Sequence, residues 1–210
     1  MTGAANNNFY STCMINICNI PKTENKCNSS PQLSNEPVGF LCCNTPWYYN
    51  NGAVDTVDFD SISYKLVRGL RGIPNNSVNY SSPFTHEYPM TPFCIPPTKT
   101  NIKCRPRTNL NPPRGFFFDE TNGDIIVTPT NCKEVPILVI EQTEYRKDSA
   151  TGKWLVIGRT RRDMQMWVID ECGYNKPPII NGPFNWNICE GEKICKKIKI
   201  EDETFTPHQT

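Results

Sequence analysis

Residues 115–170 constrain the fold more than any other stretch of the sequence, because they read as extended strands joined by tight turns. Apolar runs at 116–118 and 125–127 flank an Asn122-Gly123 pair, which favours a β-hairpin because both residues tolerate a positive φ. Two longer runs, 135–145 and 153–170, flank a polar turn at 147–152. The stretch therefore predicts two antiparallel hairpins.

In the run 153–170, successive residues alternate between two faces of the predicted strand. Met164, Met166 and Val168 fall on one face, together with Thr160 and Arg162. The other face carries Arg159, Arg161, Asp163, Gln165 and Trp167. One apolar face and one polar face are typical of a half-buried antiparallel sheet.

The composition favours an all-β protein. The chain has 210 residues and 19 prolines, and no segment reads as an amphipathic helix. A formal net charge of +1 gives no indication of a nucleic-acid partner. No apolar run reaches the roughly 18 residues of a transmembrane helix, so we expect no membrane span.

The cysteines indicate an oxidising, extracellular setting with several disulfides. There are 11 of them, without the paired Cys-x-x-Cys spacing of a zinc site. Cys94 and Cys104 are predicted to bond locally, which would contribute about 2–3 kcal/mol; the alternative is that each pairs elsewhere. The vicinal pair Cys42-Cys43 is expected to have separate partners, because a bond between neighbours is strained.

The N-terminus lacks the charged start and apolar core of a signal peptide, so we expect a segment of a longer secreted protein or a start lost upstream.

Residues 68–113 form a long proline-rich insertion. An Asn/Pro start, an apolar strand, cysteines and an acidic cluster occur once from residue 28 and again from residue 175. We expect residues 1–27 to be the terminal strand of a preceding unit and a linker, 28–171 one domain, and 172–210 a partial second repeat.

Three motifs resemble the cadherin-like repeat family. They are Asp58-Phe-Asp60 before the strand ending in Tyr64-Lys-Leu66, Phe118-Asp119 before Thr121-Asn-Gly123-Asp-Ile125, and Val168-Ile-Asp170 before Asn175 and Pro177. Segments 112–119, 123–131 and 161–165 are also similar to large, repetitive surface adhesins of Bacteroidota, of the gliding-motility type exported by type IX secretion. The resemblance implies an Ig-like or cadherin-like antiparallel β-sandwich with the proline-rich insertion, followed by the start of a second similar domain.

The resemblance also implies calcium at the junctions between repeats. Calcium prefers six to eight oxygen ligands, and Asp55, Asp58 and Asp60 are close enough in sequence to converge on one ion. The second predicted ligand set consists of Asp170, Glu171, Asn175, Glu201 and Asp202. The alternative is that both sets are solvated turn residues. No other cofactor is predicted.

Three surface features are candidates for contact with sugars. Trp47, Tyr48, Tyr49 and Trp167 are a predicted aromatic platform for a glycan, with core packing as the alternative. The arginines at 159, 161 and 162 are candidates for binding acidic polysaccharide, with a solvated face paired to acidic neighbours as the alternative. Asp148-Ser149-Ala150 fits the short O-glycosylation pattern of Bacteroidota, which makes Ser149 a candidate sugar acceptor.

The predicted function is structural. No catalytic constellation interrupts the strands, so we expect no enzyme. The expected role is a repeat segment of an extracellular adhesin or filament at the cell surface, used in attachment or gliding motility. Its expected partners are neighbouring repeats of the same chain and surface glycans. The alternative is a carbohydrate-binding module of a secreted multidomain protein.

Overall fold

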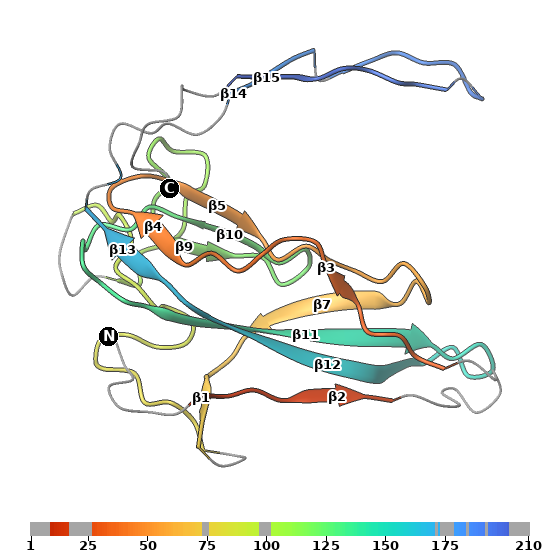
Figure 1. The fold of residues 1–210 in the computed structure, drawn as a ribbon, viewed down its shortest axis with the longest axis horizontal. Helices are drawn as coiled ribbons and strands as arrows, with labels where there is room; N and C mark the ends of the chain where they lie inside the picture. Colours follow the sequence, from red (N-terminus) through yellow and green to blue (C-terminus); the bar gives the residue numbers. More distant parts are fainter. Residues whose placement is uncertain are drawn as a thin grey trace. The chain divides into compact units, whose positions relative to one another are not determined.

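The computed structural model describes residues 9–16, 27–72, 76–96, 102–170, 172, 179–183, 185–191 and 193–201. These residues form strands and loops and contain no helix, so the fold is all-β as predicted (Figure 1). Consequently no helix in this part of the chain is long and apolar enough to cross a membrane. The chain divides into two compact units, residues 1–170 and 171–210.

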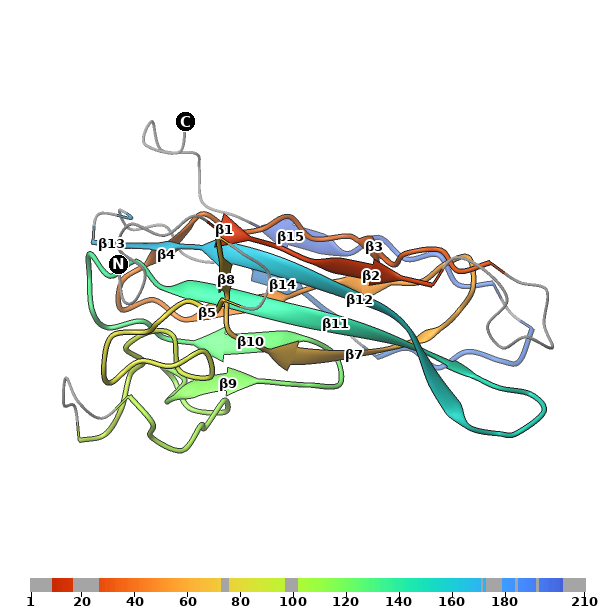
Figure 2. The same cartoon turned by 90° about the horizontal axis from the view of Figure 1, so that it is seen from below.

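The largest sheet of the first unit has four antiparallel strands in the order β2, β12, β11, β7, and β2, β12 and β11 run side by side in Figure 2. Their bounds are Cys13–Ile15 for β2, Ser61–Leu66 for β7, Ile137–Lys147 for β11 and Trp154–Gln165 for β12. β11 and β12 form the long hairpin predicted around the polar turn. A β-bulge between Glu144 and Tyr145 shifts their register.

A second sheet has three strands in the order β5, β10, β9. β5 spans Trp47–Asn50, β9 spans Phe116–Phe118 and β10 spans Asp124–Val127. β9 and β10 are the hairpin predicted at Asn122-Gly123, where Gly123 has a φ of 79°. A Cβ at Gly123 would lie 3.0 Å from the ring of Tyr64 on β7. The turn of one sheet thus lies directly against an aromatic ring of the other sheet.

One hydrophobic core lies between the two sheets. The four-stranded sheet contributes Tyr64 and Leu66 of β7, Leu138 and Ile140 of β11 and Met164 of β12. The three-stranded sheet contributes Tyr49, Phe116, Ile125 and Val127. The first unit is therefore a two-layer β structure, in which each sheet buries its apolar face against the other.

The run from 153 to 170 differs from the expected single strand. It leaves the large sheet at Met166 and continues as β13 (Trp167–Ile169). β13 pairs in parallel with β4 (Phe40–Cys42), so that Trp167 lies opposite Phe40 and Ile169 opposite Cys42. The predicted alternation still holds, because Met164, Met166 and Val168 are buried whereas Trp167 is 58% exposed.

The N-terminal segment also differs from its expectation. Instead of ending a preceding unit, Cys13–Ile15 pairs with β12 as an edge strand of the large sheet, and the segment falls in the first compact unit. Two short antiparallel pairs accompany the sheets. β1 (Phe9–Tyr10) pairs with β8 (Leu70–Arg71), and β3 (Gln32–Leu33) pairs with β6 (Ala53–Val54).

Beyond β8, the described part of the proline-rich insertion is anchored mainly by buried side chains. Val78 is fully buried and packs with Ile137 and Val139 in a second cluster. Met90 is fully buried in the main core. Thr85 and Tyr88 exchange backbone hydrogen bonds of 3.1 and 3.2 Å in a tight turn.

Disulfides join distant parts of the first unit. Cys94 bonds to Cys104, which is the pairing predicted from their spacing. Cys43 bonds to Cys132 across a sequence separation of 89. Cys42 is disulfide-bonded as well, and because Cys43 is bonded to Cys132, the neighbours Cys42 and Cys43 do not pair with each other. Disulfides of this number are typical of proteins that fold outside the cytosol.

In the second unit, β14 (Ile179–Asn181) pairs antiparallel with β15 (Lys199–Glu201). Ile179, Ile180 and Ile200 on this pair are all at least half exposed. The expected similarity of this unit to the first domain remains a prediction.

Candidate functional site

The acidic loop between β6 and β7 is folded around the carboxylate of Asp55. Asp55 is 7% exposed, and its Oδ1 accepts hydrogen bonds from the backbone N–H groups of Val57 (3.0 Å) and Asp58 (2.9 Å). Its Oδ2 accepts one from the N–H of Asp60 (3.3 Å). Asp55 therefore fixes the backbone conformation of the loop through these hydrogen bonds, as aspartate does in Asx-turns.

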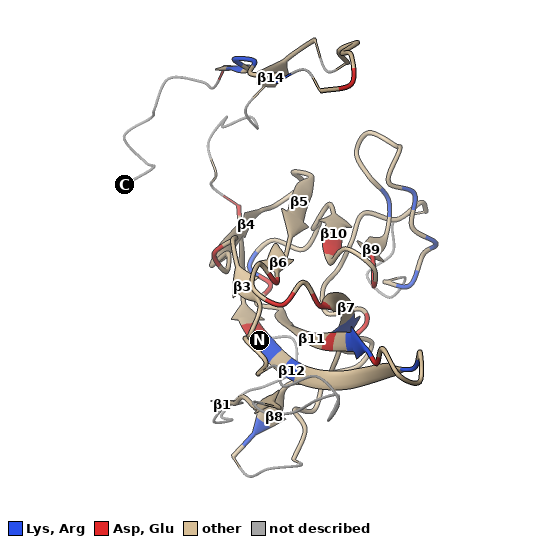
Figure 3. Cartoon of the chain, turned by 90° about the vertical axis from the view of Figure 1, so that its right-hand side faces the viewer, with Lys and Arg blue, Asp and Glu red and all other residues tan. Residues whose placement is uncertain are grey.

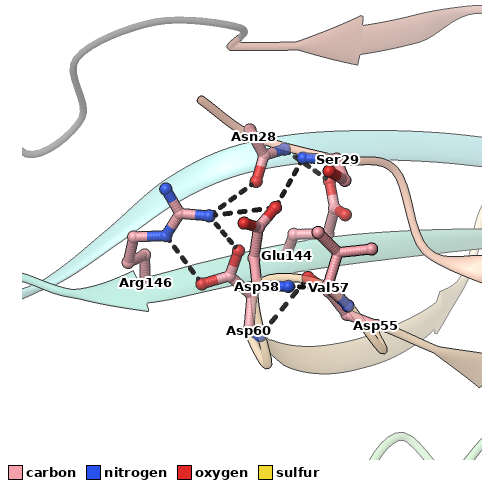
Figure 4. A network of polar contacts seen from close by, with 8 residues as sticks. All are labelled: Asn28, Ser29, Asp55, Val57, Asp58, Asp60, Glu144 and Arg146. Atoms are coloured by element: carbon pink, nitrogen blue, oxygen red, sulfur yellow. Dashed lines mark hydrogen bonds and ion pairs between the residues drawn. The ribbon is translucent and has the colours of Figure 1, made fainter. Parts of the chain in front are cut away.

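Arg146 of β11 neutralises the other two carboxylates (Figure 4). Its Nε and Nη2 donate to the two oxygens of Asp60 at 2.9 and 2.6 Å, a bidentate arrangement. Nη2 also lies 3.4 Å from Asp58 Oδ2 and donates to Asn28 Oδ1 at 3.0 Å. The hydrogen bond with Asp60 raises the pKa of Arg146, since it stabilises the charged form.

The structure brings the three predicted calcium ligands together, but their oxygens also have partners within the protein. One oxygen from each of Asp55, Asp58 and Asp60 lies within 4.8 Å of the others, so the three carboxylates do converge. However, Asp60 and Asp58 already hold the guanidinium group of Arg146, and Asp55 accepts three backbone hydrogen bonds. Arg146 thus supplies a cation to this loop, and calcium would have to compete with it for the same oxygens; the calcium site remains a prediction.

The second predicted calcium set remains a prediction. Asp170 is exposed at the end of the first unit, and Glu201 forms an ion pair with Lys199 on β15 of the second unit. Glu171, Asn175 and Asp202 lie outside the described residues. Asp170 also lies near Cys43 and Cys132, but these two sulfurs are bonded to each other and offer no thiolate ligand.

Glu144 is a buried carboxyl group next to this network. It is 1% exposed, Asn28 Nδ2 donates to its Oε2 at 3.5 Å, and its Oε1 has no partner among the described residues. The pKa of Glu144 is raised from 4.5 to about 7, mainly by burial and in smaller part by the charges of Asp55 and Asp60, against the opposing effects of Asn28 and Arg146. Sequence reasoning missed this residue, because Glu144 occurs in a strand whose alternation looks ordinary.

A pocket of about 610 Å³ opens beside the Arg146 network. Its apolar lining includes Phe59, which is 83% exposed, and Trp154, which is 57% exposed; Tyr145 and Lys147 line it as well. Phe59 has a φ of 58°, a left-handed conformation that is unfavourable for a bulky residue. Such strain is typically found at binding sites. The pocket combines exposed rings with buried charged groups at its edge.

The predicted aromatic platform is not a single surface. Trp47 and Tyr49 stack on each other with ring centroids 5.2 Å apart and pack against the core, whereas Tyr48 is exposed. Trp167 is exposed on β13 opposite Phe40. Core packing is therefore the better interpretation of Trp47 and Tyr49, and the exposed rings at the pocket, Phe59 and Trp154, were not singled out from the sequence.

The basic run on β12 is largely engaged within the protein. Arg161 Nε lies 2.9 Å from Glu141 Oε2. Arg162 donates to the backbone oxygen of Asn35 and to Asn51 Oδ1. These contacts favour the alternative interpretation, in which the arginines on this face of the sheet pair with neighbouring residues of the protein.

Ser149 is exposed in the β11–β12 turn, where Asp148 accepts hydrogen bonds from Ala150 N and Thr151 Oγ1. The turn presents the serine hydroxyl group to solvent. Its modification by a sugar remains a prediction.

Comparisons with protein-family models, curated proteins and solved structures find no match to this chain.

Proposed function

We propose that the first unit is a load-bearing β-sandwich repeat of an extracellular adhesin or filament, with the Ig-like or cadherin-like character that its sequence motifs suggest. The proposed setting is the bacterial cell surface, with the gliding-motility adhesins exported by type IX secretion as the nearest analogy. Neighbouring repeats of the same chain are the proposed partners. The number of disulfides supports the extracellular location.

The observation that carries this proposal is the parallel pairing of β4 and β13. β4 is an early strand of the first unit, and β13 ends at the boundary of that unit. The pair is extended by hydrogen bonds from Trp167 N to Gly39 O (3.0 Å) and from Cys43 N to Ile169 O (2.9 Å). Tension on the two ends pulls parallel strands in opposite directions along their length, so that these hydrogen bonds are loaded together.

Single-molecule pulling tests this mechanical role. With the disulfides reduced, we expect a higher unfolding force when the first unit is pulled from its two ends than when it is pulled between residues 133 and 165. Those two residues lie at the open end of the β11–β12 hairpin, where the paired strands separate one bond at a time. Equal forces in the two geometries would contradict the proposal.

The pocket beside Phe59 and Trp154 favours carbohydrate binding as a second candidate function. Exposed aromatic rings next to charged side chains suit the apolar face and the hydroxyl groups of a sugar. We expect glycan binding by the isolated chain to be lost in Trp154→Ala. Trp167→Ala is the matched control, because Trp167 is 58% exposed and Trp154 57%. Retained binding in Trp154→Ala would contradict this second role.

A further inference from the structure

A segment of the proline-rich insertion is exceptional in its charge. No acidic residue occurs between Glu87 and Asp119, whereas the same interval contains Lys99, Lys103, Arg105, Arg107 and Arg114. The chain as a whole has a net charge of only +1, so these cations are concentrated against a balanced background. Lys99 lies outside the described residues, and the other four define what we call the basic loop, residues 102–114. In Figure 3 the loop that leads into β9 carries several of the blue segments.

The backbone of the basic loop is held in place on both sides. The Cys94–Cys104 disulfide anchors its start, next to Ile102, which is 1% exposed. At its end, Gly115 has a φ of 79°, and a Cβ there would lie 2.9 Å from the carbonyl oxygen of Cys104 and from Pro106 Cα. Only glycine fits this close approach of two backbone segments. The cations are thus displayed on a fixed scaffold.

Within the loop, two arginines lie directly opposite each other. Arg107 and Arg114 form an antiparallel bridge and exchange backbone hydrogen bonds of 2.9 and 3.1 Å. Opposite residues in such a pair project to the same side, so two like charges are held together, which is locally unfavourable. Arg114 Nε also donates to the backbone carbonyl oxygen of Arg105 at 3.2 Å, so the side chain of Arg114 lies beside the backbone of Arg105.

No acidic group compensates these charges in the described part of the chain. Lys103, Arg105, Arg107 and Arg114 form no ion pair there, in contrast to Arg146 and Arg161. Lys103 lies 5.6 Å from the centroid of the Tyr88 ring. Lys103, Arg105 and Arg107 are exposed and Arg114 is partly exposed. A rigid set of unneutralised cations costs stability and is expected where a ligand supplies the missing anions.

We propose that the basic loop binds an acidic polysaccharide, through the carboxylate or sulfate groups of successive sugars. Guanidinium groups match such planar or tetrahedral anions with paired hydrogen bonds. The sequence of the loop contains no aromatic residue, whereas sites for single-stranded nucleic acids combine cations with rings that stack on the bases. The disulfides place the loop in an environment where acidic polysaccharides occur. This inference does not depend on the mechanical role proposed above.

Binding of the full chain to polygalacturonate and to heparin, with neutral dextran as control, tests the proposal. We expect binding to at least one of the two acidic chains, none to dextran, and weakening as the salt concentration rises from about 50 to about 200 mM. The variant Arg105→Gln/Arg107→Gln/Arg114→Gln is expected to bind at least about tenfold more weakly. Its melting temperature should not fall, because the substitutions relieve repulsion.

The matched control is Lys65→Gln/Arg68→Gln/Lys153→Gln, which removes three exposed cations elsewhere on the same unit. We expect this variant to bind like the unmodified protein. Equal losses in the two variants would show that only net charge matters and would overturn the proposal. Absence of binding to both acidic polysaccharides, or tighter binding to single-stranded DNA or to vesicles of anionic phospholipid, would overturn it as well.

Discussion

Gly158 faces Glu144 across the β11–β12 pair, and a Cβ atom at Gly158 would lie 1.5 Å from Glu144 Oε2. The buried carboxyl group therefore occupies the space that a side chain at 158 would need. We expect Gly158→Ala to lower the free energy of unfolding by about 1–3 kcal/mol, measured by urea denaturation. Gly39→Ala is the control, because a Cβ at Gly39 meets no atom within 4 Å. If both substitutions lower the free energy of unfolding by similar amounts, the contact with Glu144 is not the cause of the loss at Gly158.

The raised pKa of Glu144 makes stability depend on pH. The carboxyl group titrates near 4.5 in the unfolded chain and near 7 in the fold. Between these values the folded protein binds more protons than the unfolded chain, so stability falls as the pH rises through this window and levels off above it. Glu144→Gln removes the ionisation. Relative to the unmodified protein, the variant should gain stability on the order of 3 kcal/mol between about pH 4 and about pH 8. If the difference in unfolding free energy between the two proteins stays constant from about pH 4 to about pH 8, the pKa of Glu144 is not raised in the fold.

Arg146 is expected to be essential for the acidic loop. Its loss leaves the carboxylates of Asp58 and Asp60 buried without their cation, so Arg146→Gln should destabilise the protein by about 3–5 kcal/mol. Arg161→Gln breaks a more exposed pair with Glu141 and should cost about 1 kcal/mol or less. Comparable losses in thermal or urea unfolding of the two variants would contradict the central position of Arg146.

The ion pairs of Arg146 also determine how the protein is expected to respond to calcium. Because Arg146 already neutralises the loop, calcium and a chelator should leave the melting temperature of the first unit unchanged. In Arg146→Gln the carboxylates lose this cation, so added calcium should raise the melting temperature of the variant. A melting temperature of the unmodified unit that falls on adding chelator would restore the calcium prediction for Asp55, Asp58 and Asp60.

The disulfides Cys43–Cys132 and Cys94–Cys104 should differ in their contribution to stability. The loop closed by Cys43 and Cys132 has a sequence separation of 89, and that closed by Cys94 and Cys104 has one of 10. Loop-closure entropy predicts about 4–5 kcal/mol for the first and about 2–3 kcal/mol for the second. Unfolding of the paired variants Cys43→Ala/Cys132→Ala and Cys94→Ala/Cys104→Ala measures the difference. A larger loss in the second variant would show that local packing, not loop length, dominates.

The strands that local pattern determines were predictable from the sequence. The Asn122-Gly123 turn, the polar turn at 147–152 and the alternation from Met164 to Val168 identified two hairpins and a buried face. These features depend on neighbouring residues only, so one sequence is enough to read them. The same holds for the short loop closed by Cys94 and Cys104.

Features that depend on distant partners were not predictable. Nothing near Trp167 indicates that the chain leaves the large sheet to pair in parallel with residues 40–42. The convergence of Asp55, Asp58 and Asp60 was expected, but Arg146, far away in sequence, determines what they bind. The pocket rings Phe59 and Trp154 come from separate loops and strands in the same way. Tertiary contacts, not composition, give these residues their chemistry.

The contact between Gly123 and the ring of Tyr64 has a consequence for evolution. A side chain at 123 would strain the turn and also push against the ring, so these two positions constrain each other although they lie in different sheets. Divergent descendants of this domain should keep glycine at the turn wherever they keep an aromatic residue on β7. Such paired retention gives a search for distant relatives a signature that overall sequence identity does not supply.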